Sequence, residues 1–285
     1  MTKNTPLKDL KVAILLNGTF ELENKSDKRH PLGRYNSSIS NVFNHINKII
    51  NANELMLQTK IYNSNQANYE ILTDALVNFM NFFMAHIDVM GGIITDFYPE
   101  KKEHEKINKE LNRLDARNYV AKIINHIKHN GGILNPASIV NLKNEAIFGF
   151  FVEGYADGVI GPYKAVHSNG DDVISINYFI RKVTADIFLI DNFIASSIEK
   201  HIKFKKEEQC NEKLLNTLEK ISKFPLRFFD MEYKRKHLMF SMKNGVITLE
   251  HLKFKRNMIM YGQFSTIYST DGTTRAFKIP LMARE

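Results

Sequence analysis

The chain has 285 residues, of which 44% are hydrophobic and 25% charged, and this composition excludes an intrinsically disordered protein. Its one cysteine, Cys210, excludes an intramolecular disulfide framework and fits a reducing cytoplasm. A formal net charge of +8 favours acidic partners, whether nucleic acid or protein. The N-terminal apolar run KVAILL is far shorter than the ~20 residues that a membrane span needs. We therefore expect a cytoplasmic protein that does not enter a membrane.

Residues 1–66 predict a small α/β unit. The pair Asn17-Gly18 stands between the β-prone runs KVAILL and TFELE, which is typical of a hairpin with a type I′ turn. Residues 24–38 are polar and predict a long loop, and a helix is expected to begin near Ser38 or Ser40. After this helix, the alternating run ELMLQTKIYN predicts a second strand.

Residues 67–222 predict a helical domain. Apolar residues recur at intervals of three or four from Leu72 to Phe97, and Pro99 ends this helix. A second helix is expected to fold back and end at the glycines 131 and 132. A third helix, capped by Ser138, would place Glu153 and Asp157 on one face, where they could bind a divalent ion or simply be solvated.

The regular apolar stripe within residues 173–205 predicts a long helix of about 45–50 Å. Such a helix either packs in the core or forms a seam for self-association, and we favour the core. A charged connector with a short helix that ends at Pro225 then leads to residues 223–285. Here Asn244-Gly245 and Asp271-Gly272 predict hairpin turns of an antiparallel β meander. The fold class is therefore α+β, with an N-terminal α/β unit, a central helical bundle and a C-terminal meander.

The stretch RNYVAKIINHIKHNGGIL resembles HEPN domains, helical nucleotide-binding domains common in bacterial defence and toxin proteins. In that family an Arg holds phosphate and a His on the same helix moves the proton, and the two meet across a dimer. The resemblance implies an RNA site at Arg117, His126 and His129. Both histidines come later than the four to six intervening residues of the family pattern. A basic last turn that complements the helix dipole is the alternative.

Basic residues interleaved with aromatic ones in the C-terminal meander offer a second candidate site. Basic side chains beside aromatic rings suit single-stranded nucleic acid, whereas simple strand alternation places the same charges in solvent. The candidate interaction residues are Lys234, Arg235, Lys236, Lys253, Lys255 and Arg256. Neither His86 nor His104 has the spacing of metal ligands, so we expect no metal and no cofactor.

The chain is rich in Asn, Ile, Lys, Phe and Met and has no Trp, which is similar to proteins from AT-rich bacterial or phage genomes. Without the spacing of a catalytic site, and with a long striped helix and a separate β unit, it resembles a phage anti-defence protein of the anti-Gabija type. That resemblance implies a non-enzymatic inhibitor that forms homo-oligomers and binds a defence nuclease complex. The competing hypotheses are a HEPN-like RNA-binding or RNA-cleaving protein and a nucleic-acid-binding module.

Overall fold

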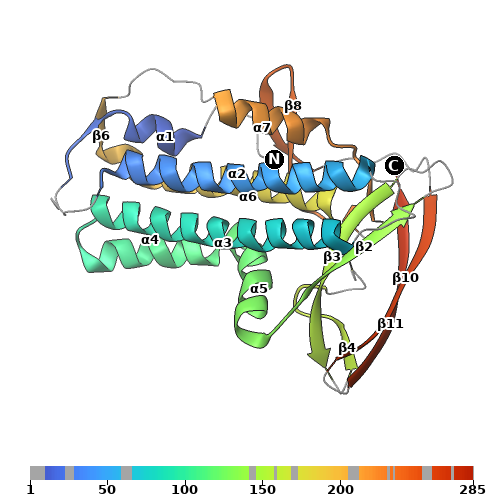
Figure 1. Ribbon diagram of the computed structural model, residues 1–285. Helices are drawn as coiled ribbons and strands as arrows, with labels where there is room; N and C mark the ends of the chain where they lie inside the picture. The colour runs from blue at the N-terminus through green and yellow to red at the C-terminus, as the bar shows by residue number, and fades with distance from the viewer. Residues whose placement is uncertain are drawn as a thin grey trace.

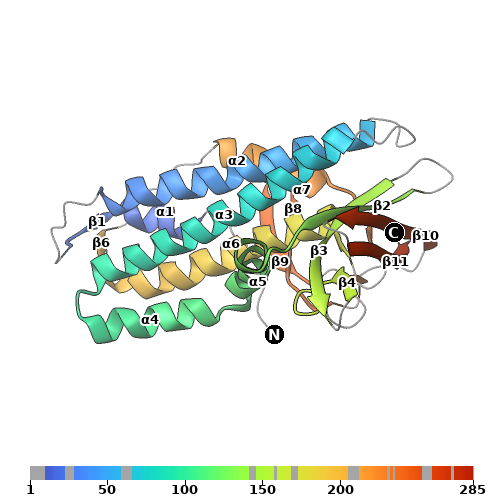
Figure 2. The ribbon, with the colours of Figure 1, turned by 60° about the horizontal axis from the view of Figure 1, so that its bottom comes forward.

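The protein has a mixed α+β fold, as the sequence predicts (Figure 1). The computed structural model describes residues 10–22, 29–58, 66–140, 146–156, 159–167, 173–204, 212–229, 232–233, 235–251, 259–270 and 273–284. An elongated helical body carries most of the β-structure at one end (Figures 1 and 2).

Four helices lie side by side in the body in the order α2, α3, α6 and α4 (Figure 2). Their bounds are Pro31–Gln58 for α2, Gln66–Phe97 for α3, Lys101–Arg113 for α4 and Ile176–Ile198 for α6. Helix α7, Glu212–Lys223, packs on α2 on the side of the body away from α4 (Figure 1). Helix α5, Asp115–Asn130, leaves the body at an angle and forms an elbow with α4 (Figure 1).

The N-terminal segment differs from the predicted hairpin. Residues Lys11–Leu16 form helix α1, and Asn17 ends it in the right-handed helical region with φ −82° and ψ −8°. The Asp191 carboxylate accepts the Val12 N–H at 3.3 Å, so a tertiary contact satisfies one of the free amides at the start of the helix. Strand β1, Thr19–Phe20, pairs with distant β6, Ile202–Phe204. A short apolar run alone does not distinguish helix from strand.

Helix α2 is longer at both ends than the predicted helix. It begins at Pro31, which suits the first turn because proline lacks the N–H that would be free there. The His30 Nδ1 accepts the Leu32 N–H at 3.3 Å and adds a side-chain cap. Helix α2 continues to Gln58, so the first part of the run predicted as a strand is helical, and its remainder lies outside the described residues.

Helix α3 ends at Phe97, two residues before Pro99, as predicted. Its stretch Asn68–Phe97 is long and apolar enough to cross a membrane by length and composition, although 44% of the most apolar window is buried inside the protein. The predicted second helix is two helices, because Leu114 has extended backbone angles between α4 and α5. Gly131 ends α5 in the left-handed region with φ 65°, as expected.

The helix predicted from Ser138 is wrong, because this region forms antiparallel strands. Strand β2, Leu134–Val140, pairs along its whole length with β3, Ala146–Ala156. Strand β3 also pairs with β4, Val159–Pro162, and with β5, Ile174–Ser175. A Cβ at Gly149 would lie 2.4 Å from the Ile174 carbonyl oxygen, so glycine allows the close approach of β5. The aromatic and β-branched residues of β3 favour this sheet.

Helix α6 is a core helix, in agreement with the predicted core packing. It is shorter than predicted, at 23 residues, because a 3-10 turn, Glu199–His201, and strand β6 follow it. Most of its residues are buried, and they include four charged side chains, Arg181, Lys182, Asp186 and Asp191. Each has internal partners; for example, the Tyr35 hydroxyl donates to Asp191 at 2.7 Å.

The C-terminal strands form two small sheets instead of one meander. Strands β8, Met239–Lys243, and β9, Val246–Glu250, form a hairpin in which Asn244 and Gly245 both have positive φ, as predicted. Strands β10, Ile259–Thr270, and β11, Thr273–Arg284, form a long ribbon. Strand β7, Phe228–Phe229, pairs with the last residues of β11.

In the part of the chain whose side chains the structure describes, one hydrophobic core connects the three predicted units. Its buried members include Leu16 from α1, Phe83 from α3, Phe179 from α6 and Phe240 from β8. The helices and the β8–β9 hairpin therefore share apolar burial, which is the main stabilising contribution to folding.

Arg181 connects α6 to the C-terminal end of α7 and to β8. Its guanidinium donates to the Phe240 carbonyl at 3.1 Å, the Ser222 carbonyl at 3.0 Å and the Phe224 carbonyl at 2.7 Å. We expect Arg181→Met to lower the free energy of unfolding by about 3 kcal/mol, because it leaves buried carbonyls without donors. Urea unfolding measures this, with Lys213→Met on the exposed face of α7 expected to change stability by less than about 0.5 kcal/mol. Equal effects of the two substitutions would contradict the expectation.

Candidate functional site

Several interacting ionisable groups lie around the first half of α6, and we call them the α6 polar cluster. Three segments that are distant in the sequence contribute to it: α5, α6 and the segment between β7 and β8. Its members are Tyr119, Tyr178, Lys182, Asp186, Glu232, Arg235 and His237.

Lys182 and Asp186 form a buried ion pair one turn apart on α6. The Lys182 Nζ lies 2.5 Å from the Asp186 Oδ2, and the side chains are only 4% and 6% exposed. The same Nζ lies 4.0 Å from the centre of the Tyr119 ring, which adds a cation–π contact. Burial raises the pKa of Asp186 to about 6, and the Lys182 charge limits the rise. The pair therefore connects α6 to α5.

Glu232 connects the segment after β7 to the beginning of α6. Its carboxylate accepts the Ser175 N–H at 2.8 Å, the Ser175 hydroxyl at 2.6 Å and the Phe229 N–H at 2.9 Å. Ser175 is also the N-cap of α6, since its Oγ accepts the Tyr178 N–H at 3.2 Å. Glu232 is 2% exposed, and burial raises its pKa to about 7, with Arg235 and the three donors opposing the rise.

Tyr178 and His237 form the outer part of the cluster. The Tyr178 hydroxyl is hydrogen-bonded to the His237 Nδ1, and the Arg235 guanidinium carbon lies 5.3 Å from the centre of the Tyr178 ring. Burial raises the pKa of both Tyr178 and Tyr119. Desolvation, with Lys182 and Arg235 nearby, lowers the pKa of His237 to about 4. At neutral pH the hydrogen bond therefore joins a protonated phenol to a neutral imidazole.

The chemistry of the cluster indicates a structural role, which is to hold neighbouring segments of the chain together. An activated tyrosine nucleophile or base needs a lowered pKa, whereas burial moves the pKa of both phenols in the opposite direction. Lys182 and Glu232 are held by internal partners. Because β7 ends at Phe229, three residues before Glu232, and pairs with β11, the Glu232 contacts hold the base of the β10–β11 ribbon against α6.

The predicted basic site of the C-terminal segment is only partly described. Arg235 is directed into the α6 polar cluster, over Tyr178, whereas Lys236 is exposed. The remaining candidates, Lys234, Lys253, Lys255 and Arg256, lie outside the described residues.

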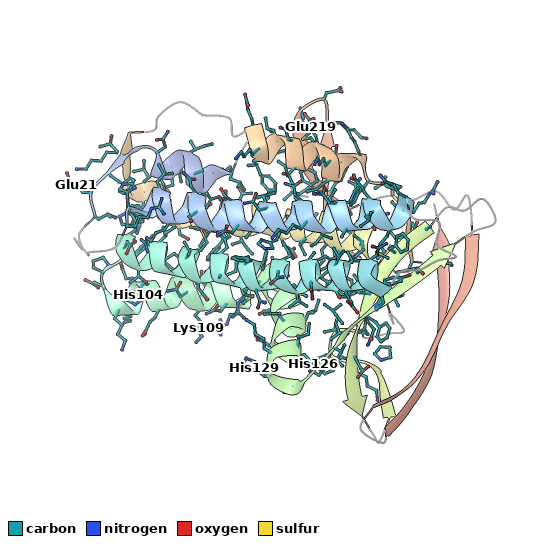
Figure 3. The ribbon with its side chains drawn as sticks, viewed as in Figure 1. Glu21, His104, Lys109, His126, His129 and Glu219 are labelled. Carbon is teal, nitrogen blue, oxygen red and sulfur yellow. The ribbon has the colours of Figure 1, made fainter. Side chains whose placement is uncertain are left out.

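The predicted RNA-site residues all lie on α5 but face different ways. The His126 ring stacks on Tyr163 with 3.6 Å between centroids, and its Nε2 contacts the Glu153 carbonyl oxygen at 2.8 Å. Arg117, nine residues earlier, is on the opposite face of the helix at ~100° per residue. His129 is exposed near the C-terminal end (Figure 3). Within one chain these three residues do not converge.

The carboxylates predicted to share a helical face do not do so. Glu153 is a buried residue of β3 that accepts a hydrogen bond from the Asn135 amide at 3.2 Å, and Asp157 lies outside the described residues. In the described part of the chain, no group of three or more His, Cys, Asp or Glu residues could hold a metal ion.

Tyr178, Lys182 and Glu232 were not predicted as site residues from the sequence. One signal was available: Arg181, Lys182, Asp186 and Asp191 interrupt a helix that is otherwise strongly apolar. A charge inside a core helix requires a partner, and this points to a polar contact without identifying the partner. Glu232 had no such signal, because other charged residues stand close to it in the sequence.

Comparisons with protein-family models, with curated proteins and with solved structures find no match for this chain.

The pH dependence of stability tests the burial of Glu232. Its pKa is raised in the folded state, so the protonated carboxyl favours folding below its ordinary pKa of 4.5, and this contribution is lost as the pH rises towards 7. We expect the melting temperature of Glu232→Gln, relative to the wild type, to rise by several degrees between pH 5 and pH 7.5. Differential scanning fluorimetry measures this.

Asp186, His237 and His86 titrate in both proteins, so the difference between the two melting curves isolates Glu232. Glu219→Gln, on the exposed face of α7, is the control and should give a difference that does not depend on pH. A pH-independent difference for Glu232→Gln as well would refute the prediction.

Proposed function

We propose that this protein is a non-enzymatic interaction protein from the conflict between phages and bacteria, which binds a defence protein complex and inhibits or regulates it through oligomeric assembly. The partner we propose is a protein, for instance a defence nuclease complex, and the place of action is the host cytoplasm. The observation that carries the proposal is the β10–β11 ribbon.

The ribbon offers main-chain hydrogen-bonding groups along one edge. Its two strands are 12 residues each, and β10 is the outermost strand of the order β10-β11-β7. The ribbon contacts β2 and β4, yet in the described chain neither of them pairs with β10. A long unpaired edge is a template for another strand, and proteins bind extended partner segments in this way.

The register identifies which groups of β10 point outward. The last pair of the β10–β11 ladder is Thr270↔Thr273, with two residues between them in the sequence. In a hairpin whose strands are joined by two residues, the pair next to the connection is hydrogen-bonded. Because hydrogen-bonded pairs alternate, Gln263 and the other odd-numbered residues of β10 direct their N–H groups away from β11. Pro280, which has no N–H, lies opposite Gln263 and agrees with this register, since such a pair has no ladder hydrogen bond.

The α6 polar cluster is a second observation that supports the same proposal. Its charged groups are held by internal partners, and they fix the base of the ribbon instead of facing a substrate. A firmly held base reduces the conformational entropy that the ribbon loses on binding, which favours a protein that works by contact.

Copurification tests the proposal. The tagged protein is expressed in bacteria that carry candidate defence systems, and mass spectrometry with an absorbance ratio identifies what it retains. A stoichiometric protein partner together with loss of defence is the expected result. RNA retained without a protein would contradict the proposal and favour the HEPN-like alternative.

Two proline substitutions on adjacent residues test the role of the β10 edge. Gln263→Pro removes an outward N–H, so we expect at least a tenfold loss of partner binding with the melting temperature nearly unchanged. Phe264→Pro removes an N–H directed to β11 and should destabilise the ribbon itself. Affinity by biolayer interferometry and hydrogen exchange of β10 distinguish the two. Wild-type affinity of Gln263→Pro would exclude pairing at this edge.

A further inference from the structure

Helix α4 carries a row of cations on its most exposed side. Lys102, Lys106, Lys109 and Arg113 follow at intervals of four, three and four residues, so they lie on one helical face. All four are exposed, and Leu111, the buried residue of α4, lies on the opposite face. The row is ~16 Å long, with ~4.5–6 Å between successive residues along the axis.

The row is available for a ligand. Lys101, beside it, contacts Glu105 at 3.8 Å, whereas the structure gives the four residues of the row no ion pair within the described chain. The acids Glu103 and Glu110 lie on one flank of the row and Glu105 on the other. A rod-shaped polyanion that lies along α4 therefore meets the cations first.

Helix α5 extends the basic surface around the elbow. Lys122 and His129 lie on one face of α5, seven residues apart, and Asn125 lies between them. All three side chains are exposed. Figure 3 shows Lys109 on the lower side of α4 and His129 on α5 below it. Residues 101–130 contain eight Lys and Arg and four Asp and Glu, so their formal net charge is +4. This is half of the net charge of +8 of the whole chain.

The chemistry of this surface selects one class of polyanion. Proteins that bind single strands stack bases on aromatic rings, and the one aromatic residue among residues 101–130 is Tyr119, which belongs to the α6 polar cluster. A straight row of cations without aromatics fits the regular phosphates of a duplex, one charge per ~1.7 Å of its axis, better than the irregular carboxylates of an acidic protein.

We propose that the exposed faces of α4 and α5 bind the phosphate backbone of a double-stranded nucleic acid without reading its sequence. Lys102, Lys106, Lys109 and Arg113 make the principal contacts, and the amide and imidazole groups of α5 donate to neighbouring phosphates. This site is separate from the β10 edge, so it adds a nucleic-acid contact to a protein that otherwise works through a protein partner.

Fluorescence anisotropy with a labelled DNA duplex of about 20 base pairs tests the proposal. Four phosphate contacts predict a ~100-fold loss of affinity between 50 and 200 mM salt, from a slope of ~−0.9 per contact. In the quadruple variant Lys102→Gln, Lys106→Gln, Lys109→Gln and Arg113→Gln, the slope should become shallower by about three to four. Glutamine is a good helix former, so α4 should persist, which circular dichroism checks.

Two controls separate the row from net charge. The matched variant Lys213→Gln, Lys220→Gln, Lys223→Gln and Lys243→Gln also removes four exposed cations, three on α7 and one at the end of β8, and should keep wild-type affinity within about threefold. Replacing Lys102, Lys106 and Lys109 by Arg keeps the charge and should keep binding. Equal losses of duplex affinity in the two quadruple variants would mean that binding depends on net charge alone, and this would overturn the proposal.

The choice of ligand is tested with the wild-type protein. A DNA duplex and an RNA duplex should bind through the same row, and the tighter of the two identifies the natural source. Preference for a single strand, equally tight binding of poly-glutamate, or no duplex binding at 50 mM salt would each overturn the proposal.

Discussion

The structure depends on one constraint: α6 is buried along most of its length and nevertheless carries four charged side chains. A charge that is removed from water without a partner is costly, so each one must find a partner inside the protein. Asp191 binds the start of α1 and Tyr35 of α2, Arg181 binds carbonyls around α7 and in β8, and Lys182 lies against Asp186 and the α5 ring Tyr119. The charges of one core helix thereby position most of the surrounding elements.

The same helix connects the core to the proposed interaction surfaces. At its N-terminal end, Ser175 and Glu232 hold the segment after β7 and with it the base of the ribbon. Helix α4 packs on the body through few residues, so nearly its whole charged surface is left to solvent. The protein we propose thus has an interior in which charges are satisfied internally, and two outer features, a strand edge and a row of cations, whose groups are left for partners.

The sequence predicted the α+β class, the end of α3 before Pro99, the glycine end of α5, the core position of α6 and the Asn244-Gly245 turn. These features depend on local rules: helical spacing, the missing N–H of proline and the tolerance of Gly and Asn for positive φ. The sequence misassigned α1 and the β2–β3 strands, where short apolar runs are compatible with either structure. Contacts from distant segments decided between them, such as Asp191 at the start of α1.

The features of the candidate sites also divide into those that local sequence patterns determine and those that contacts between distant segments decide. The sequence by itself determined that residues 101–130 are basic and that α6 carries charges among apolar residues, since both are local patterns. Only the tertiary structure decided that Arg235 faces Tyr178, that His126 stacks on Tyr163 and that Glu232 receives three hydrogen bonds. The physical reason is that a partner for a buried charge is selected by proximity in the folded chain, and residues far apart in the sequence have no periodicity that relates them.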